Sequence, residues 1–140
     1  MRQKLIDLLH DGHHSLVVER GTDISTFDTK GIATLLQMVN SGSDALRGAV
    51  VVDKVVGKAA AALMVLGGVV ELHAVLISEG ALRLLNGTGI KVDYDRRTDH
   101  IINRAGTDWC PMEKACRDCL TAGECLERIK ECLERMFSNI

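Results

Sequence analysis

Hydrophobic and polar residues follow two periods along the chain, and each period predicts a different element. Short apolar or β-branched runs between turn residues predict strands, whereas apolar residues spaced three and four apart predict helices. The strands expected on this ground are 15–20, 24–27, 49–52, 69–77 and 90–94. The expected helices are 2–10, 32–39, 54–66 and 79–85.

The stretch from Gly48 to Gly68 organises this pattern. It predicts a buried strand that passes directly into a buried helix, with Asp53 at the helix N-cap. After Lys58 the helix is apolar on all sides, so other elements must cover most of it. Gly67 and Gly68 predict its C-terminal end.

Strands that alternate with helices predict parallel pairing and an α/β fold, and the hairpin expected at 15–27 adds antiparallel pairing. We therefore expect a mixed sheet. The pattern changes after Asp95. A short helix is expected at 98–104, an irregular loop at 106–111, and a helical tail at 113–137 that is broken near 121–123.

Composition and charge narrow the function classes. A length of 140 residues favours one domain, and a net charge of −2 provides no basic surface for nucleic acid or for an anionic membrane. The first residues lack the apolar centre of a signal peptide, and the most apolar run, 59–70, is shorter than the ~20 residues of a membrane-spanning helix. We therefore expect a cytoplasmic protein.

The first candidate site is the strand-to-helix junction at 53–58. A helix that begins at the carboxyl end of a strand offers backbone N–H groups to an anion. Lys54 and Lys58 would lie one helical turn apart and face the same ligand. The alternative is structural: Asp53 is a cap, Gly57 a close-packing position, and both lysines are solvated.

The second candidate site is Ser78-Glu79, which also follows a strand directly. If the two strands are neighbours, this helix start lies near the first one. Glu79 would then act as an acid or base or hold a ligand amine. The alternative is a first-turn glutamate that the helix dipole favours.

The third candidate is the set of five cysteines, which a reducing cytosol would keep out of disulfides. Cys110, Cys116, Cys119 and Cys125 would suffice for zinc or an iron–sulfur cluster, although their spacing is not diagnostic. The alternative is that Cys125 and Cys132 share an apolar helix face as small hydrophobic residues. Cys110 lies in a loop, and a reactive thiol there would need a lowered pKa.

The order of these elements resembles the cytidine deaminase-like fold, a three-layer α/β/α sandwich with a mixed sheet. The stretch VVDKVVGKAAA, Ser78-Glu79, and the segments 102–104 and 110–113 resemble an uncharacterised prokaryotic family assigned to that fold. The resemblance runs from Leu5 to Glu113 and leaves out the cysteine-rich tail. It implies a deaminase-like core domain at 1–112 and a helical C-terminal extension at 113–140 packed on that core.

The resemblance supports the fold and argues against the usual activity. Zinc deaminases need His or Cys, any residue, then Glu on one core helix, and Pro-Cys-x-x-Cys on the next. This chain has Gly57-Lys58-Ala59 and Ser78-Glu79-Gly80 at those places, so zinc ligands are missing and a zinc-dependent hydrolytic deaminase is not expected.

The leading hypothesis is a protein that binds a small anionic, nucleotide-like metabolite at the strand–helix junctions, or a non-hydrolytic enzyme of such metabolites, without catalytic zinc or another cofactor in the core. The ligand-binding candidates are Lys54, Gly57, Lys58, Ser78, Asn103 and Arg104, and the catalytic candidates are Asp53, Glu79 and Cys110.

Two alternatives stay open. One is a metal-binding, sulfur-carrier or redox protein that acts through Cys110 and the tail cysteines, as the deaminase-fold accessory proteins of formate dehydrogenase do. The other is a non-catalytic module that forms a homo-oligomer through the apolar helix after Lys58.

Overall fold

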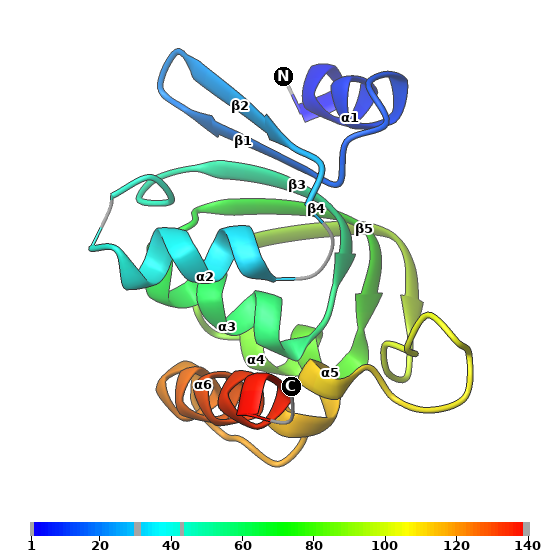
Figure 1. The fold of residues 1–140 in the computed structure, drawn as a ribbon. Helices are drawn as coiled ribbons and strands as arrows, with labels where there is room; N and C mark the ends of the chain where they lie inside the picture. The colour runs from blue at the N-terminus through cyan, green and yellow to red at the C-terminus, as the bar shows by residue number, and fades with distance from the viewer. Residues whose placement is uncertain (1, 30–31, 43, 139–140) are drawn as a thin grey trace.

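The structure is a computed structural model that describes residues 2–29, 32–42 and 44–138 (Figure 1). Its strands are β1 (Leu16–Arg20), β2 (Asp23–Phe27), β3 (Val50–Val56), β4 (Glu71–Ser78) and β5 (Lys91–Thr98). Its helices are α1 (Arg2–Asp11), α2 (Ala33–Asn40), α3 (Lys58–Gly67), α4 (Glu79–Leu85), α5 (Pro111–Cys116) and α6 (Ala122–Ser138). Among the described residues, no helix has the length and apolar character needed to cross a membrane.

The strands form a single mixed sheet in the order β2-β1-β3-β4-β5. β1 pairs antiparallel with β2 and with β3, whereas β3–β4 and β4–β5 are parallel. The predicted hairpin and the predicted mixed sheet are therefore confirmed. The two parallel crossovers run through α3 and α4, which places the starts of both helices at the carboxyl ends of neighbouring strands.

Successive side chains of β1 point to opposite faces of the sheet and belong to two different buried clusters. Leu16 and Val18 belong to the main buried cluster, whereas Val17 packs with Val52 and with Leu5 of α1 in a smaller cluster. α1 therefore covers one face, and α2, α3 and α4 lie on the other (Figure 1).

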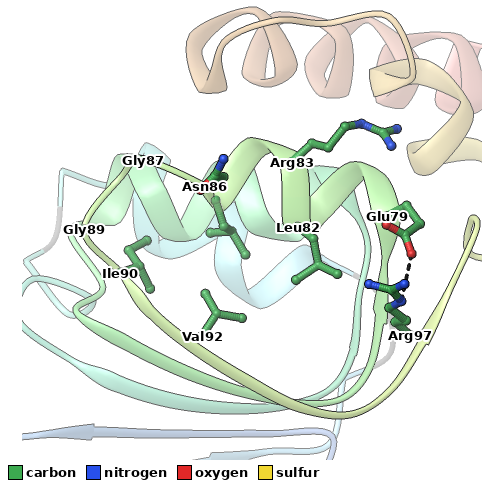
Figure 2. A pocket seen from close by; sticks show the side chains of 10 residues that line it. Glu79, Leu82, Arg83, Asn86, Gly87, Gly89, Ile90, Val92 and Arg97 are labelled. Carbon is green, nitrogen blue, oxygen red and sulfur yellow. Dashed lines mark ion pairs between the residues drawn. The ribbon is translucent and has the colours of Figure 1, made fainter.

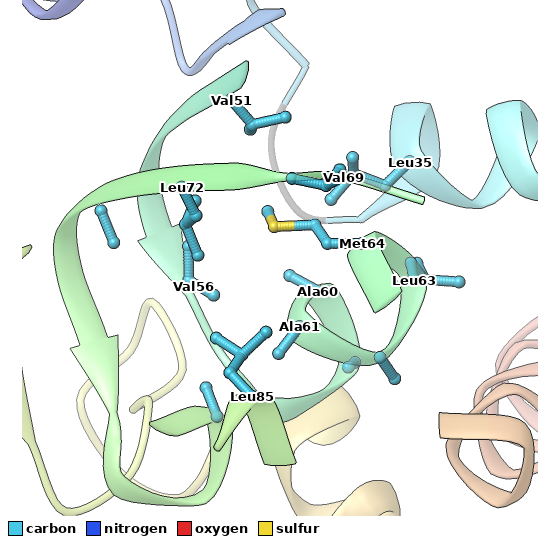
Figure 3. Close-up of a cluster of buried hydrophobic side chains, with 14 of the residues drawn as sticks. Leu35, Val51, Val56, Ala60, Ala61, Leu63, Met64, Val69, Leu72 and Leu85 are labelled. Atoms are coloured by element: carbon cyan, nitrogen blue, oxygen red, sulfur yellow. The ribbon is translucent and has the colours of Figure 1, made fainter. Parts of the chain in front are cut away.

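The main cluster is centred on α3, whose residues from Lys58 to Met64 are all buried. Met64 and Ala60 point toward Val56 and Leu72 of the sheet (Figure 3). α5 and α6 pack against α3 on its side away from the sheet, where Ile129 joins the same cluster (Figure 1). The all-round apolar helix is thus covered as expected, and it ends at Gly67 with Gly68 in the left-handed conformation.

The boundary between β3 and α3 differs from the prediction. Strand β3 continues to Val56, so Asp53 lies within the strand, and α3 begins at Lys58 with Gly57 as its N-cap. The expected N-cap at Asp53 is wrong because Val55 and Val56 pair with Leu76 and Ile77 of β4. This pairing with a distant segment holds 53–56 extended.

The helix expected at 98–104 is also wrong. β5 runs to Thr98 because it pairs with β4 as far as Ser78. The chain from 99 to 110 is a loop that an isolated bridge between Ile102 and Trp109 closes. The predicted boundary between a core domain at 1–112 and an extension at 113–140 stays a prediction. Residues 139 and 140 of that extension lie outside the described residues. Its described helices, α5 and α6, pack on α3.

Candidate functional site

Glu113 ties the starts of α3 and α4 together. It lies in the first turn of α5 and is buried. One carboxylate oxygen accepts hydrogen bonds from the Lys58 backbone N–H (2.8 Å) and the Ser78 hydroxyl (3.3 Å). The other accepts from the Ile101 backbone N–H (2.7 Å). The anion site expected at the start of α3 therefore holds a carboxylate of the same chain.

Glycine at position 57 follows from this arrangement. A Cβ built there would lie 3.3 Å from the Glu113 carboxylate oxygen and 3.2 Å from Ile101 Cγ1. Side chains seldom pack so tightly, so a larger residue would require Ile101 or the Glu113 carboxylate to shift by a few tenths of an ångström.

The two lysines do not share a ligand-binding face. Lys54 is exposed on β3, whereas Lys58 is buried at the first position of α3. The Lys58 ammonium group donates to the backbone carbonyls of Arg117 (3.2 Å) and Cys119. The expectation that both lysines face one ligand is wrong because four residues span one turn only within a helix, and 54–56 is a strand.

Asp53 is buried in the sheet, where its strand neighbours are Leu16 and Ala74. Burial raises the pKa of its carboxyl group to about 7, although hydrogen bonds from the Val55 and Lys54 backbone N–H groups act in the opposite direction. Asp53 lies within β3 and is therefore not at the start of α3, where the sequence predicted it.

Ser78 and Glu79 lie at the start of α4, as expected. The Ser78 hydroxyl oxygen caps the helix by accepting a hydrogen bond from the Ala81 backbone N–H (3.1 Å). Glu79 forms an ion pair with Arg97 of β5, with 3.1 Å between Oε1 and Nε. This pair joins α4 to the edge strand of the sheet.

A hollow of about 410 Å³ lies between α4 and β5 (Figure 2). Its apolar side is formed by Leu82, Leu85, Ile90 and Val92. Its charged and polar lining consists of Glu79, Arg83, Asn86 and Arg97, with Gly87 and Gly89 at one end. The Arg97 side chain is 60% exposed, so its guanidinium group is accessible to a ligand from solvent.

A second space borders the junction itself and is far smaller. It measures about 30 Å³, and Lys58, Trp109, Glu113 and Arg117 are among its lining residues. That volume accommodates about one water molecule, not a metabolite. The indole of Trp109 stacks on His100, with ring centroids 4.1 Å apart, and Arg117 lies over the same indole at 5.5 Å.

Asn103 and Arg104 lie in the loop after β5 and do not line the hollow. The Asn103 side-chain oxygen accepts a hydrogen bond from the Thr107 backbone N–H (3.0 Å), which shapes the loop itself. Arg104 is exposed. The structure therefore does not bring this pair together with Glu79 around the hollow.

The other face of the sheet carries a polar cluster around His73, which is buried on β4. Its Nδ1 lies 2.8 Å from Asp93 Oδ2, and its Nε2 lies 3.3 Å from Asp95 Oδ1. Hydrogen bonding with His73 lowers the pKa of Asp93. These contacts link β4 to β5 across the sheet.

The cysteines separate into three groups. Cys116, Cys119 and Cys125 lie together in the main buried cluster beside Lys58. Cys110 is half-buried at the N-cap of α5, and Cys132 lies farther along α6, with its sulfur 4.0 Å from the Pro111 carbonyl oxygen. Within the described ranges, no group of three or more His, Cys, Asp or Glu residues is arranged to hold a metal ion.

The comparison with protein families decides where this chain belongs. Residues 4–133 match the family model described as "TM1506: Domain of unknown function (DUF1893)". The chain belongs to the DUF1893 family. The DUF1893 match extends through α5 and most of α6, so the expectation that the cysteine-rich tail lies outside the family is wrong. No curated protein matches the chain.

A solved structure of a DUF1893 family protein (TM1506) from Thermotoga maritima has the same fold. The two chains are 26% identical and superpose with a TM-score of 0.84, covering 93% of this chain and 88% of the other. The description of the family states no activity, so any function has to be argued from the site.

Sequence reasoning named Ser78, Glu79 and Lys58 as candidates in this DUF1893 chain, and the structure places them at the starts of α3 and α4. Sequence reasoning assigned no role to Glu113. Its signal in the sequence was slight: a glutamate two residues after Pro111, at the start of a helix. Arg97 was not among the candidates because α4 and β5 form the hollow only after β5 has paired with β4.

Proposed function

We propose that this DUF1893 protein has the three-layer cytidine deaminase-like arrangement and binds a small anionic, nucleotide-like metabolite in the hollow between α4 and β5. The sheet order, the parallel crossovers through α3 and α4, and helices on both faces support the fold proposal. The proposed ligand site lies in this hollow and not at the strand–helix junction expected from the sequence. Glu79 is a residue of both sites.

The chemistry at the helix starts supports a role other than zinc-dependent deamination. Deaminases place their metal-binding His and Cys residues at the starts of two adjacent helices. Here those positions carry Lys58 and Ser78, and Glu113 binds both of them. The ammonium, amide and hydroxyl groups of Lys58 and Ser78 are satisfied by that carboxylate and by carbonyls, and none of these groups is a soft donor for zinc.

The observation that carries the binding proposal is an apolar wall with the guanidinium group of Arg97, paired with Glu79, at one end of it (Figure 2). A volume of about 410 Å³ lies in the range of small-molecule pockets. Leu82, Ile90 and Val92 offer a surface for a flat ring, while Arg97 offers a planar donor to a phosphate or carboxylate. A ligand with both parts, such as a nucleoside monophosphate, matches this division.

Calorimetric titration with nucleoside monophosphates, and with the matching uncharged nucleosides, tests the proposal. Arg97→Ala should weaken monophosphate binding by ~10-fold or more, because a charge-assisted hydrogen bond contributes ~1.5–3 kcal/mol. Glu79→Gln should tighten binding, because Arg97 then loses its internal partner. Arg96→Ala is the matched control, because Arg96 is the exposed neighbour of Arg97 on β5 and does not line the hollow.

Two results would overturn the proposal. One is the absence of binding to every monophosphate tested at millimolar concentration. The other is a loss of affinity in Arg96→Ala equal to that in Arg97→Ala, which would reflect general surface charge instead of the hollow.

A further inference from the structure

Three thiols gather beneath the turn at 117–121 that connects α5 to α6. Cys116 ends α5, Cys119 lies in the turn, and Cys125 lies in the first turn of α6. All three are buried, and the Cys116 thiol lies 3.7 Å from the Cys125 carbonyl oxygen. The three thiols are close enough to affect one another's pKa values.

A buried ammonium group lies against this cluster. Lys58 donates to the carbonyls of Arg117 and Cys119, and its charge acts on all three thiols. In the described part of the chain, Lys58 forms no ion pair with a carboxylate. A buried charge is costly without a counter-charge, so this ammonium favours a thiolate beside it.

The geometry selects Cys125 as that thiolate. It lies near the N-terminus of a 17-residue helix, which favours a negative charge. Hydrogen bonding with Cys116 and the charge on Lys58 lower the pKa of Cys125 to about 7, against the effects of burial and of the nearby Glu124 carboxylate. Hydrogen bonding with Cys125 and burial raise the pKa of Cys116, so Cys116 remains the proton-bearing partner.

We propose that Cys125 is the reactive thiolate of a thiol–disulfide exchange site, and that Cys116 is the partner with which it forms a protein disulfide. The co-reactant is a small organic disulfide. This site is independent of the hollow between α4 and β5.

The exchange proceeds in two balanced steps. The Cys125 thiolate attacks one sulfur of the small disulfide, which forms a mixed disulfide and releases one small thiolate. The Cys116 thiol then loses its proton to that thiolate or to solvent and attacks the Cys125 sulfur, which releases the second small thiolate. The two cysteines are oxidised by two electrons in total, and one small disulfide is reduced to two small thiols.

Access requires the turn to open, because Cys116 and Cys125 are fully buried. The turn is suited to this motion. Leu120 in this turn is 85% exposed and lies outside the core, and the buried Lys58 side chain donates to two of the turn's backbone carbonyls. We therefore expect exchange on the timescale of local opening and not of global unfolding.

Peptide mapping of the full-length protein provides the first test. The reduced protein is incubated with oxidised glutathione, alkylated, and digested with trypsin, which cuts after Lys114, Arg117 and Arg128. Cys116 then lies on a different peptide from Cys119 and Cys125. The expected product is peptide 115–117 linked by a disulfide to peptide 118–128.

Variants assign the roles of the two cysteines. Cys116→Ser should stop at a mixed disulfide between Cys125 and glutathione, whereas Cys125→Ser should give neither product. Cys132→Ser is the matched control, since Cys132 is also a buried cysteine of α6, and it should still form the linked peptides. A loop between Cys119 and Cys125, or no oxidation of Cys125, would overturn the proposal.

The pH dependence of Cys125 alkylation provides a second test. If Lys58 has only a structural role, replacing it should leave the midpoint of this pH dependence unchanged. Cys125 should react with iodoacetamide with a midpoint near pH 7, and Lys58→Met should raise that midpoint and slow the reaction at pH 7 on the order of tenfold. Circular dichroism checks that the variant is folded. An unchanged midpoint in a folded variant, or stoichiometric zinc on the purified protein, would contradict the proposal.

Discussion

At the scale of single residues, the contrast between Glu113 and Asp53 is informative. Both carboxyl groups are buried. Glu113 accepts hydrogen bonds from two backbone N–H groups and one hydroxyl supplied by three separate segments, so it holds those segments together. Asp53 is held by backbone N–H groups of its own strand, and burial dominates its ionisation. The first residue stabilises the junction, whereas the second makes the stability of the fold depend on pH.

We predict that Asp53 destabilises the protein as pH rises. Its pKa is raised from 3.8 in the unfolded chain to about 7 in the folded protein, so between these values the folded state binds more protons than the unfolded state. The free energy of unfolding should therefore fall between about pH 4 and pH 7, by on the order of 4 kcal/mol at most, and then level off. Asp53→Asn should lose this part of the pH dependence and be the more stable protein above pH 7.

Urea unfolding of both proteins at several pH values measures the difference. Groups shared by the two proteins cancel when the free energies are subtracted at each pH. Parallel curves for wild type and Asp53→Asn would show that the carboxyl group ionises in the fold as it does in the unfolded chain.

At the scale of elements, the sequence predicted those helix ends that a single nearby residue determines. Helix α4 begins after Ser78, which caps it, and α3 ends where Gly68 adopts a left-handed conformation. The end of β3 was not predictable in this way, because its last residues are extended through pairing with β4. The candidate site shows the same limit, since Glu113 lies 55 residues from Lys58 and 35 from Ser78, and no local pattern indicates those contacts.

The end of α3 provides a prediction at this scale. Gly68 has φ of +88°, and a Cβ there would lie 3.3 Å from the Arg47 Cα atom. Gly68→Ala should lower the free energy of unfolding by ~1–2 kcal/mol. Gly123→Ala in α6 is the matched control, because its Cβ would meet nothing closer than the Thr121 Oγ1 at 4.0 Å, and it should be neutral or stabilising.

Thermal melting followed by circular dichroism compares the two glycine variants. If Gly68→Ala melts at the temperature of Gly123→Ala or above it, the left-handed residue does not determine where α3 stops. The end of the helix would then depend on tertiary packing against Leu46, which contacts Gly67.

At the scale of the whole molecule, the C-terminal segment completes the core. Cys116, Cys125 and Ile129 are buried in the main cluster, and Leu126 and Leu133 pack against it. Each such side chain stabilises a fold by ~1.5–3 kcal/mol, and a domain of this size is stable by ~5–15 kcal/mol in total. The match of the DUF1893 family model through residue 133 agrees with a segment that is part of the fold.

A chain shortened to residues 1–112 should therefore fail to unfold cooperatively, because it loses both the cover of α3 and the Glu113 carboxylate that joins the two helix starts. A chain of residues 1–136 keeps the described packing of α6 and should retain the full-length free energy of unfolding within about 1 kcal/mol.

Denaturant unfolding of the two shortened chains and the full-length chain shows whether residues 1–112 fold on their own. A sharp transition in 1–112 would establish the division predicted from sequence, with an independent core and a dispensable tail. Its loss would mean that the junction at Lys58 and Ser78 forms only when the cysteine-rich helices close over α3, which makes the tail part of any site built there.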